Sequence, residues 1–305
     1  MSDEKPGFLP GFSHVILRER RSTVEIITSK QNPQILHAVR LQERKHRQKD
    51  ELFVFDGIKL CKEAMLAGVI PEKIYLRMSS REHVLAWMEQ ELPGKNFSEH
   101  PALIALDDAV FEKISLEKSP EGIICVAKYI DKCHKIVTIN NKEHQVSYSV
   151  GASERILLLE SVRDPGNLGT IIRSAAAFGI DRLILSEDCA DLYNAKTIRA
   201  SMGAIFRQRI DRTNDLPTLI RCLRSDGRRV YAAALDATAA KLGTLPLKPQ
   251  DGIVIGNEGH GLTDASISAC DGCLFIPMTG ATESLNAAMA ATVCMWELYR
   301  GQITL

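Results

Sequence analysis

Three polar, glycine-containing loops hold the residues of this chain whose types and spacing could do chemistry. They span residues 164–179 (DPGNLGTIIRSAAAFG), 256–262 (GNEGHGL) and 276–286 (IPMTGATESLN). Each follows an apolar run that is typical of a strand and leads toward a helix-like stretch. Because ligands bind outside the carboxyl ends of the strands in open parallel sheets, the pattern predicts one composite site.

The first loop combines a turn with an amphipathic helix. Pro165 and Gly166 favour a turn, and apolar residues then recur at helical spacing. Arg173 lies off this apolar stripe, one turn into the helix, so it could face the cleft. Its planar guanidinium suits a phosphate or a carboxylate. By position alone, a surface arginine on a helix is the competing interpretation.

The second loop has three glycines in six residues, which permit positive φ and a close approach of backbone to a ligand. The sequence lacks the Gly-Lys-Ser/Thr of a Walker loop and is not a G-x-G-x-x-G that opens a first helix. Glu258 is the carboxylate of this loop and could orient a substrate or Arg173, with a helix-start acid as the alternative. His260 is a further candidate, as a general base.

The third loop begins with Pro277, which ends the preceding strand because it cannot donate to the ladder. The following stretch, residues 285–300, has apolar residues at helical spacing. Ser284 and Asn286 stand at the start of this helix. Helix capping explains both residues and is compatible with a functional role.

These loops resemble, in order and spacing, the three motifs of the SpoU (TrmH-type) RNA ribose methyltransferases. The resemblance covers roughly residues 155–300, and the family belongs to the knotted SPOUT superfamily of S-adenosylmethionine enzymes. The upstream sequence ITSKQNPQILHAVRLQERKHRQKDELFVFDG resembles the start of the substrate-binding domain that precedes the SpoU domain in ribosomal RNA methylases.

The resemblance implies roles for individual residues. The catalytic arginine of the family lies six residues after an asparagine, and Asn167 and Arg173 match that spacing. Glu258, Ser284 and Asn286 would complete the catalytic, substrate-facing side. The cofactor would be S-adenosylmethionine, and the residues expected to bind it are Gly256, Asn257, Gly261, Ile276, Met278, Leu285 and Leu235. No metal is expected.

The chemistry implied is an in-line displacement at a sulfonium methyl carbon by a ribose 2′-hydroxyl. The donor is already activated, so alignment can supply much of the catalysis. The hydroxyl is a poor nucleophile until its proton is removed or shared. With a pKa above about 12, arginine is a poor base. Polarising the hydroxyl, holding the adjacent phosphate, or acting as base in an unusual environment all remain open for Arg173.

The elements that must position these loops alternate between apolar runs and helical stretches. The runs show little polar alternation, as in parallel strands covered on both faces, and they lie at residues 156–159, 183–185, 230–235, 253–255 and 273–276. Helices between them predict an α/β fold. Physical rules alone predict an unknotted sheet, whereas the family resemblance implies a C-terminal trefoil knot.

Four segments are expected along the chain. They are an N-terminal tail (1–22), a smaller α/β RNA substrate-binding domain (23–133), a linker or edge hairpin (134–153) and the methyltransferase domain (154–305). In the smaller domain a basic helix is expected over residues 35–49. Its candidate RNA contacts are Arg40, Arg44, Lys45, Arg47 and Lys49, with a solvated helix face as the alternative.

Composition excludes few classes of protein. Lys+Arg and Asp+Glu are equal at 38 each, which argues mildly against a general nucleic-acid coat but allows a local basic face. Eight scattered cysteines suit a reducing cytosol, and the lone C-x-x-C at Cys270 and Cys273 lacks the second pair that a metal site needs. No signal peptide or long apolar run is present, so a cytoplasmic protein without a membrane span is expected.

The sequence therefore predicts an S-adenosylmethionine-dependent RNA 2′-O-ribose methyltransferase that acts on large-subunit ribosomal RNA and forms a homodimer. A transfer RNA substrate is the alternative within the same enzyme class. A catalytically inactive RNA-binding or ribosome-assembly protein is the alternative of a different class. A nicotinamide dehydrogenase would need a dinucleotide fingerprint that this chain lacks.

Overall fold

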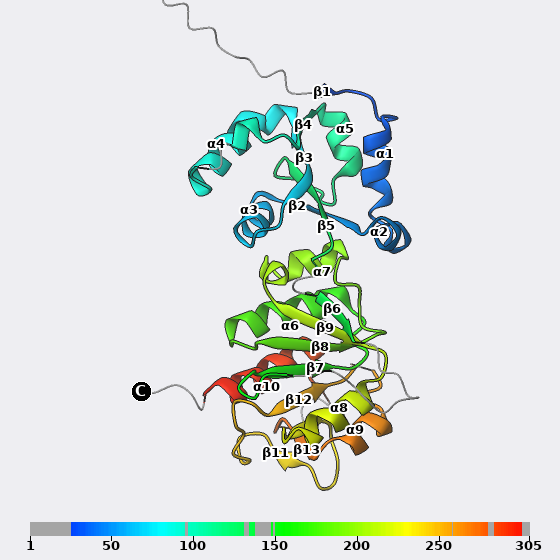
Figure 1. The fold of residues 1–305 in the computed structure, drawn as a ribbon, viewed down its shortest axis with the longest axis vertical. Coiled ribbons are helices and arrows are strands. Elements are labelled where there is room, and N and C mark those ends of the chain that lie inside the picture. The colour runs from blue at the N-terminus through cyan, green and yellow to red at the C-terminus, as the bar shows by residue number, and fades with distance from the viewer. Residues whose placement is uncertain are drawn as a thin grey trace, which may run out of the picture.

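The chain folds into two α/β units that lie one above the other along the long axis of the molecule (Figure 1). The computed structural model describes residues 26–94, 97–130, 134–137, 148, 150–257, 259–279 and 284–300. The predicted tail, residues 1–22, and the predicted site residue Glu258 lie outside these described residues.

The N-terminal unit is built on a five-stranded mixed sheet in the order β1-β4-β3-β5-β2. Its strands are β1 (Ile26–Ile27), β2 (Leu52–Asp56), β3 (Pro71–Arg77), β4 (Leu103–Leu106) and β5 (Ile123–Lys128). β4 runs parallel to β1 and β3, whereas β5 is antiparallel to β2 and β3. The helices are α1 (Pro33–Arg40), α2 (Arg44–Asp50), α3 (Ile58–Leu66), α4 (Arg81–Glu91) and α5 (Asp108–Ile114).

The single basic helix expected over residues 35–49 is two helices, α1 and α2. Asn32 begins α1, because its side chain accepts a hydrogen bond from Gln34 N and Pro33 occupies the first helical turn. The chain leaves the helix after Leu41, and Glu43 adopts an extended conformation before α2 begins. The predicted basic residues are therefore divided between two helices, with Arg40 on α1 and the other four on α2.

The C-terminal unit is built on an eight-stranded sheet in the order β11-β13-β10-β12-β7-β8-β9-β6, and all of its pairings are parallel. The strands are β6 (His134–Val137), β7 (Ile156–Leu159), β8 (Arg182–Ser186), β9 (Arg209–Thr213), β10 (Val230–Ala233), β11 (Ala240–Lys241), β12 (Gly252–Ile255) and β13 (Gly272–Phe275). The five apolar runs singled out in the sequence are β7, β8, β10, β12 and β13.

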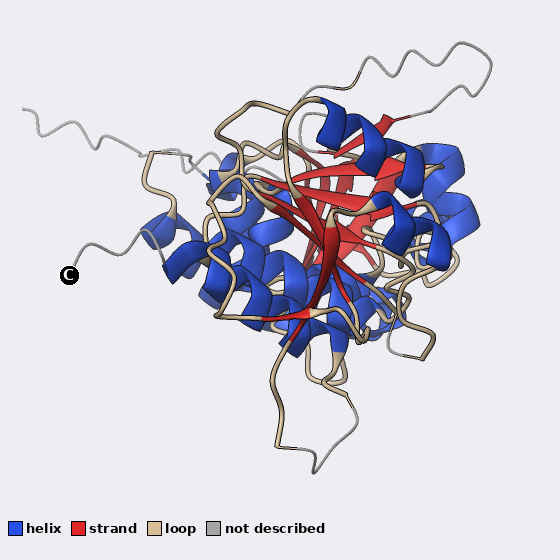
Figure 2. Ribbon diagram, turned by 90° about the horizontal axis from the view of Figure 1, so that it is seen from below, coloured by secondary structure: helices blue, strands red, loops and turns tan. Residues whose placement is uncertain are grey.

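Helices cover both faces of this parallel sheet, as Figure 2 shows from below. Leu157 and Leu159 of β7 pack on the side of α6 (Pro165–Ala177), α7 (Ala195–Ala200) and α10 (Ala287–Arg300). Ile156 and Leu158 face the opposite side, with α8 (Leu216–Ser225) and α9 (Asp264–Ala269). Neighbouring residues of one strand thus enter two separate cores, which is why the strand is apolar throughout.

The segment predicted as a linker, residues 134–153, contains an edge strand of the second sheet. β6 pairs parallel to β9 at the end of that sheet. The remainder of the segment is described only at residues 148 and 150–153. After β13 the chain returns to place α10 against α6 and β12. The trefoil knot implied by the family resemblance stays a prediction.

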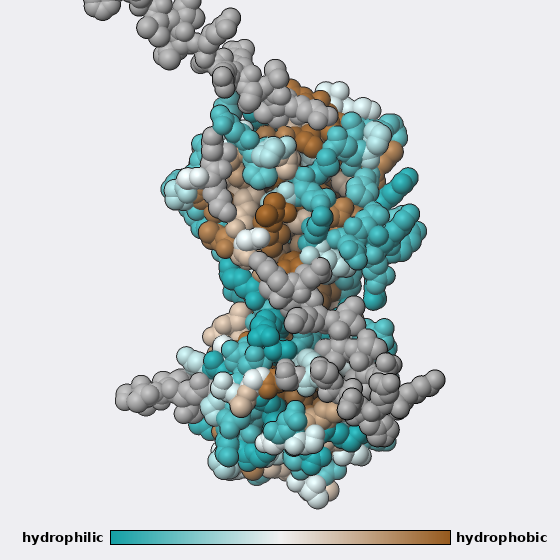
Figure 3. Space-filling view, viewed as in Figure 1, coloured by the Kyte–Doolittle hydropathy of each residue, from teal (hydrophilic) through white to brown (hydrophobic). Residues whose placement is uncertain are grey.

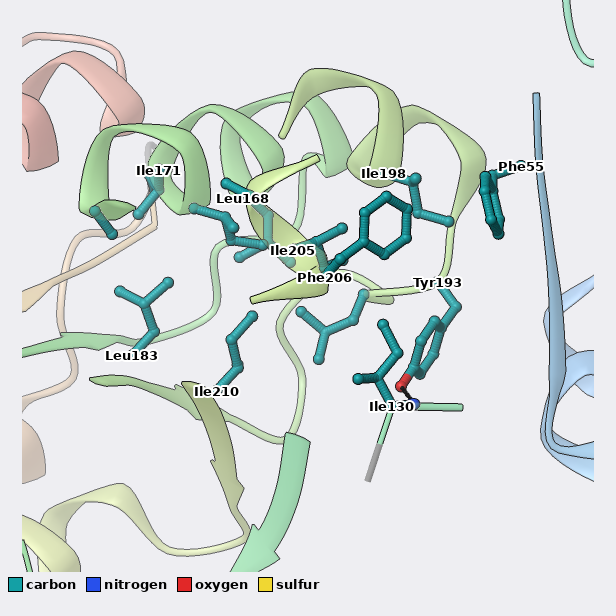
Figure 4. Packing of buried hydrophobic residues seen from close by; sticks show 14 of the residues in the cluster. Phe55, Ile130, Leu168, Ile171, Leu183, Tyr193, Ile198, Ile205, Phe206 and Ile210 are labelled. Atoms are coloured by element: carbon teal, nitrogen blue, oxygen red, sulfur yellow. Dashed lines mark hydrogen bonds between the residues drawn. The ribbon is translucent and has the colours of Figure 1, made fainter. Parts of the chain in front are cut away.

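The two units share one hydrophobic core. Phe53 of the first sheet packs on Tyr193 in a tilted arrangement with ring centroids 4.7 Å apart, and Phe55 packs on Phe206 at 5.2 Å. Tyr193 also stacks on Tyr129 at 3.9 Å. Its hydroxyl accepts a hydrogen bond of 2.6 Å from Ile130 N (Figure 4). The junction is therefore a packed interface of aromatic rings, most of them buried.

Candidate active site

A pocket of about 360 Å³ lies at the carboxyl edge of the parallel sheet, where β10, β12 and β13 end. All seven residues predicted to bind a cofactor line it: Leu235, Gly256, Asn257, Gly261, Ile276, Met278 and Leu285. His260 and Ser284 line it as well. The walls are mostly apolar with a few polar groups, the usual character of a site for a small organic ligand.

Sequence reasoning missed part of the pocket wall. The ends of the strands, with Ala234 directly after β10, contribute apolar residues: Ala233, Ala234, Ile255, Leu274 and Phe275. Ala287 and Ala290 of α10 close another side. Only the strand ends could have been anticipated, since ligands in such folds lie at the carboxyl ends of the strands.

The loop after β12 is folded back on itself by hydrogen bonds around Asn257. Asn257 N donates to Gly261 O at 3.1 Å, and Gly261 N donates to Asn257 O at 2.9 Å. The side-chain oxygen of Asn257 accepts from Gly259 N at 2.8 Å. A Cβ on Gly256 would lie 2.5 Å from the carbonyl carbon of Gly261, so this tight fold requires glycine at position 256.

The loop after β7 is held by the cap of α6. Asp164 accepts a hydrogen bond of 2.8 Å from Asn167 N, and Pro165 occupies the first turn. Asp164 also pairs with Lys196 at 2.9 Å. Hydrogen bonding to Lys196 and to Asn167 N lowers the pKa of Asp164, so the cap is an anion at neutral pH.

A hydrogen bond joins the first and third loops. Asn286 Nδ2 donates to Asn167 Oδ1 at 3.0 Å, while Asn286 Oδ1 accepts from Ala288 N at 2.9 Å and caps α10. Nearly two helical turns further along α10, the hydroxyl groups of Thr292 and Ser174 are hydrogen-bonded at 3.1 Å. The structure therefore brings together two of the predicted catalytic residues, Asn167 and Asn286.

Arg173 lies off the buried stripe of α6, as the sequence predicted, and is exposed. Its guanidinium makes no ion pair or hydrogen bond with any residue that the structure describes. Six residues of α-helix place it about 120° around the axis from Asn167. Asn167 faces α10, so Arg173 points to a different side of α6 and is not joined to the pocket by any contact among the described residues.

Four of the five basic residues predicted to contact RNA are exposed: Arg40, Arg44, Lys45 and Lys49. The surface over α2 is hydrophilic in Figure 3. Lys45 makes an exposed ion pair with Glu43 at 2.9 Å. Exposed ion pairs contribute little free energy, so Lys45 can leave Glu43 and bind another anion.

The prediction for Arg47 was wrong. Arg47 is only 3% exposed, and its guanidinium pairs with Asp191 of the C-terminal unit at 2.6 Å. It also donates to the backbone oxygens of Leu41 at 2.9 Å and Gln42 at 2.7 Å. Arg47 is thus a buried link between the two units, and it cannot offer its charge to a nucleic acid.

The described residues contain no group of three or more His, Cys, Asp or Glu side chains arranged to hold a metal ion. Cys270 and Cys273 are free thiols, and burial raises the pKa of Cys270 to about 12. No helix in the described part of the chain has the length and apolar character needed to span a bilayer.

Comparison with known families matches both units. Residues 154–296 match the SpoU rRNA Methylase family, and residues 32–125 match the MRM3-like substrate binding domain. The 23S rRNA (guanosine(2553)-2′-O)-methyltransferase RlmP of Bacillus subtilis is 29% identical over 272 residues, which are 89% of this chain and 98% of RlmP. RlmB of Xanthomonas campestris, a 23S rRNA (guanosine-2′-O-)-methyltransferase, is 36% identical over 148 residues, 48% of this chain and 59% of RlmB.

Solved structures resemble the chain over both units. An rRNA methyltransferase from Sinorhizobium meliloti superposes with a TM-score of 0.74 at 26% identity, covering 92% of this chain and 99% of that one. A structure of an rRNA methyltransferase from the same organism with AdoMet bound gives a TM-score of 0.72 at 27% identity, with the same coverage. An RNA 2′-O ribose methyltransferase gives 0.72 at 27% identity, over 90% of this chain and 98% of that one.

Proposed function

We propose that this chain, a member of the SpoU rRNA methylase family through residues 154–296, transfers a methyl group from S-adenosylmethionine to a ribose 2′-hydroxyl of RNA. The observation that carries the proposal is the pocket at the carboxyl edge of the sheet, whose lining contains every residue expected to bind the cofactor. Large-subunit ribosomal RNA is the proposed substrate, since RlmP and RlmB are named for 23S rRNA.

The pocket fits S-adenosylmethionine in size and in chemistry. Ile276 and Leu285 offer apolar surface for an adenine ring, and Gly256 leaves the backbone of its loop bare. The polar groups of Asn257, His260 and Ser284 suit the polar ends of the molecule. When bound, the cofactor supplies a methyl group already activated on a sulfonium sulfur.

The protein's own contribution is then mainly alignment. The Asn167–Asn286 hydrogen bond fixes the first turn of α6 against the start of α10, beside the residues Ser284 and Leu285 that line the pocket. Asn167 and Asn286 would thereby orient the ribose. Arg173, an exposed cation without a partner among the described residues, would act on the RNA by polarising the hydroxyl or by holding the adjacent phosphate.

The N-terminal unit would deliver the RNA. Arg40, Arg44, Lys45 and Lys49 form an exposed basic surface on α1 and α2, suited to phosphates. Phosphate contacts position a nucleic acid without selecting its sequence, so selection would come from the shape of the RNA and from base contacts.

A homodimer in the cytoplasm is the proposed state of the protein. α10 keeps an exposed apolar face formed by Met289, Val293 and Trp296, which are 57%, 37% and 44% exposed. A helix with apolar residues on its inner and outer faces is usually buried on both. Sedimentation at micromolar concentration should show twice the chain mass of 33.8 kDa, and a monomer alone would contradict this assembly.

The function is tested by incubating the purified protein and radiolabelled S-adenosylmethionine with ribosomal RNA from a strain in which the gene is deleted, and in parallel with transfer RNA. Label at a 2′-O-methyl position in the large-subunit RNA is expected. Label in transfer RNA alone would show that the protein is a transfer RNA methyltransferase and would contradict the proposed ribosomal RNA substrate. Cofactor binding with no transfer to any RNA would favour an inactive RNA-binding protein.

A further inference from the structure

Ser161, the second residue after β7, holds a backbone conformation that its side chain disfavours. Its φ is +55°, in the left-handed region that glycine adopts easily and other residues adopt at a cost in free energy. A non-glycine residue stays there only where surrounding contacts fix it. The contacts around Ser161 therefore show what the conformation achieves.

Asp188, in the loop after β8, supplies those contacts. Ser161 Oγ donates to Asp188 Oδ2 at 2.6 Å. Ser161 N donates to Ser186 Oγ at 2.9 Å, and Ser186 Oγ donates in turn to Asp188 Oδ1 at 2.6 Å. The carboxylate thus holds both the hydroxyl and, through Ser186, the amide of Ser161.

The left-handed conformation orients the carbonyl oxygen of Ser161 toward Asn257, a residue that lines the pocket. Asn257 Nδ2 donates to Ser161 O at 2.8 Å. The same Asn257 side chain accepts hydrogen bonds from Gly259 N at 2.8 Å and from His260 N at 3.3 Å, so it sets the path of the loop after β12. Asn257, His260 and Gly261 are pocket-lining residues.

We infer that Asp188 is a positioning residue for the cofactor pocket: by holding Ser161 in the left-handed conformation, it fixes the carbonyl that anchors Asn257 and, through it, the loop that walls the pocket. The inference deepens the proposed function and rests on it for the identity of the ligand. In this role Asp188 acts through Ser161 and Asn257 and does not need to touch cofactor or RNA.

The charge state of Asp188 suits this role. Partial burial acts to raise the pKa, but hydrogen bonds from Ser161 and Ser186 and the neighbouring Arg163, 2.9 Å away, bring the pKa of Asp188 down to about 2. At neutral pH the group is therefore a carboxylate with only acceptor oxygens, as the two serine donors require.

The test compares Asp188→Ala with the double variant Asp188→Ala/Ser161→Gly. Removing the carboxylate should weaken S-adenosylmethionine binding about tenfold, the scale of the free energy needed to hold a non-glycine residue in the left-handed region. Glycine at position 161 takes up that conformation without help, so the double variant should recover most of the affinity. Titration calorimetry measures both.

A matched control exists at the opposite end of the same strand. Asp181 precedes β8, accepts a hydrogen bond of 2.8 Å from Arg155 N and has a side chain 43% exposed, against 44% for Asp188. Asp181→Ala should leave the affinity for S-adenosylmethionine unchanged. An equal loss in this control, or a loss in Asp188→Ala that Ser161→Gly does not restore, would mean that Asp188 only stabilises the fold.

Hydrogen exchange in the ligand-free protein makes the test independent of the cofactor. Asp188→Ala should speed deuterium uptake in residues 259–262, and Ser161→Gly should restore slow uptake. Unchanged uptake in Asp188→Ala would overturn the inference. If the wild-type protein binds no S-adenosylmethionine while the exchange result holds, the proposed cofactor fails and the positioning role of Asp188 stands.

Discussion

Asn167 and Asn286, which are 119 residues apart in the chain, are joined side chain to side chain by a hydrogen bond of 3.0 Å. Asn286 also caps α10 with its other side-chain atom, so one amide serves two purposes. The two purposes are separable by substitution, because aspartate is as good a cap as asparagine but has no N–H to donate.

Asn286→Asp should therefore keep the stability of the protein and lose most of its methylation rate, by at least about tenfold, the scale of a lost hydrogen bond at a fixed geometry. The new carboxylate could pair with Asn167 only if the amide of Asn167 turned over and presented different atoms to a substrate. Asn286→Ala should lose the rate and also about 1 kcal/mol of stability through the missing cap. Thermal unfolding and single-turnover methylation, measured on both variants, separate the effects, and a fully active Asn286→Asp protein would show that the bridge is not needed.

Arg173→Ala should fold normally, because the side chain is exposed and lies off the buried stripe of α6. We expect unchanged affinity for S-adenosylmethionine and a loss of at least about a hundredfold in single-turnover rate, the scale of removing a key electrostatic group. Arg221→Ala, which removes an exposed arginine of α8 bonded only to Thr218 in the described structure, is the control and should be fully active. A near-normal rate for Arg173→Ala would remove this residue from the mechanism.

Gly256→Ala should abolish cofactor binding even though the added group is small. The new Cβ would meet the backbone of Gly261 and Leu262 at 2.5–2.7 Å, so the loop after β12 must move. The obstacle is thus the protein's own backbone. Gly272→Ala is the matched control, since a Cβ there meets nothing within 4 Å. Calorimetry showing normal affinity for Gly256→Ala would contradict the tight loop.

Replacing the exposed residues Arg44, Lys45 and Lys49 by alanine should weaken RNA binding and reduce its salt dependence by about two to three counterions. Filter binding across salt concentrations measures the slope, and replacement of Lys59 on α3 by alanine provides a single-charge comparison. An unchanged slope in the triple variant would mean that α2 is an ordinary solvated face and that the RNA follows another path.

Arg47→Ala should act on stability. It would leave Asp191 without its cation at the junction of the two units, a change that typically costs about 3–5 kcal/mol when the pair is buried. Urea unfolding of Arg47→Ala, Asp191→Ala and the double variant would give the coupling between them. Additive losses would show that the pair contributes nothing beyond its separate groups.

Sequence reasoning found the strands of the catalytic unit because their apolar runs are continuous, and it found the pocket because glycine and polar residues follow those runs. It failed at Arg47, whose basic neighbours suggest an exposed helix face. The partner that buries Arg47 is Asp191, 144 residues away, and no local pattern announces it.

The same limit explains the other differences. The break between α1 and α2 depends on the extended conformation of Glu43 in a sequence that otherwise favours a helix. β6 lies in a polar stretch and is a strand through its pairing with β9, which comes much later in the chain. Asn167 and Asn286 could each be singled out, but their hydrogen bond depends on how α10 packs against α6.

The aromatic junction of Phe53, Tyr129, Tyr193 and Phe206 bears on how such a protein would choose its target. If a flexible linker joined the two units, the basic surface could stay bound at one position on an RNA while the pocket reached many neighbouring nucleotides. The packed rings and the Arg47–Asp191 pair hold the two units together and allow no such sampling. The distance from α2 to the pocket is then fixed. On the proposed function, the enzyme methylates the ribose that the folded RNA places at that distance from the phosphates bound by α2.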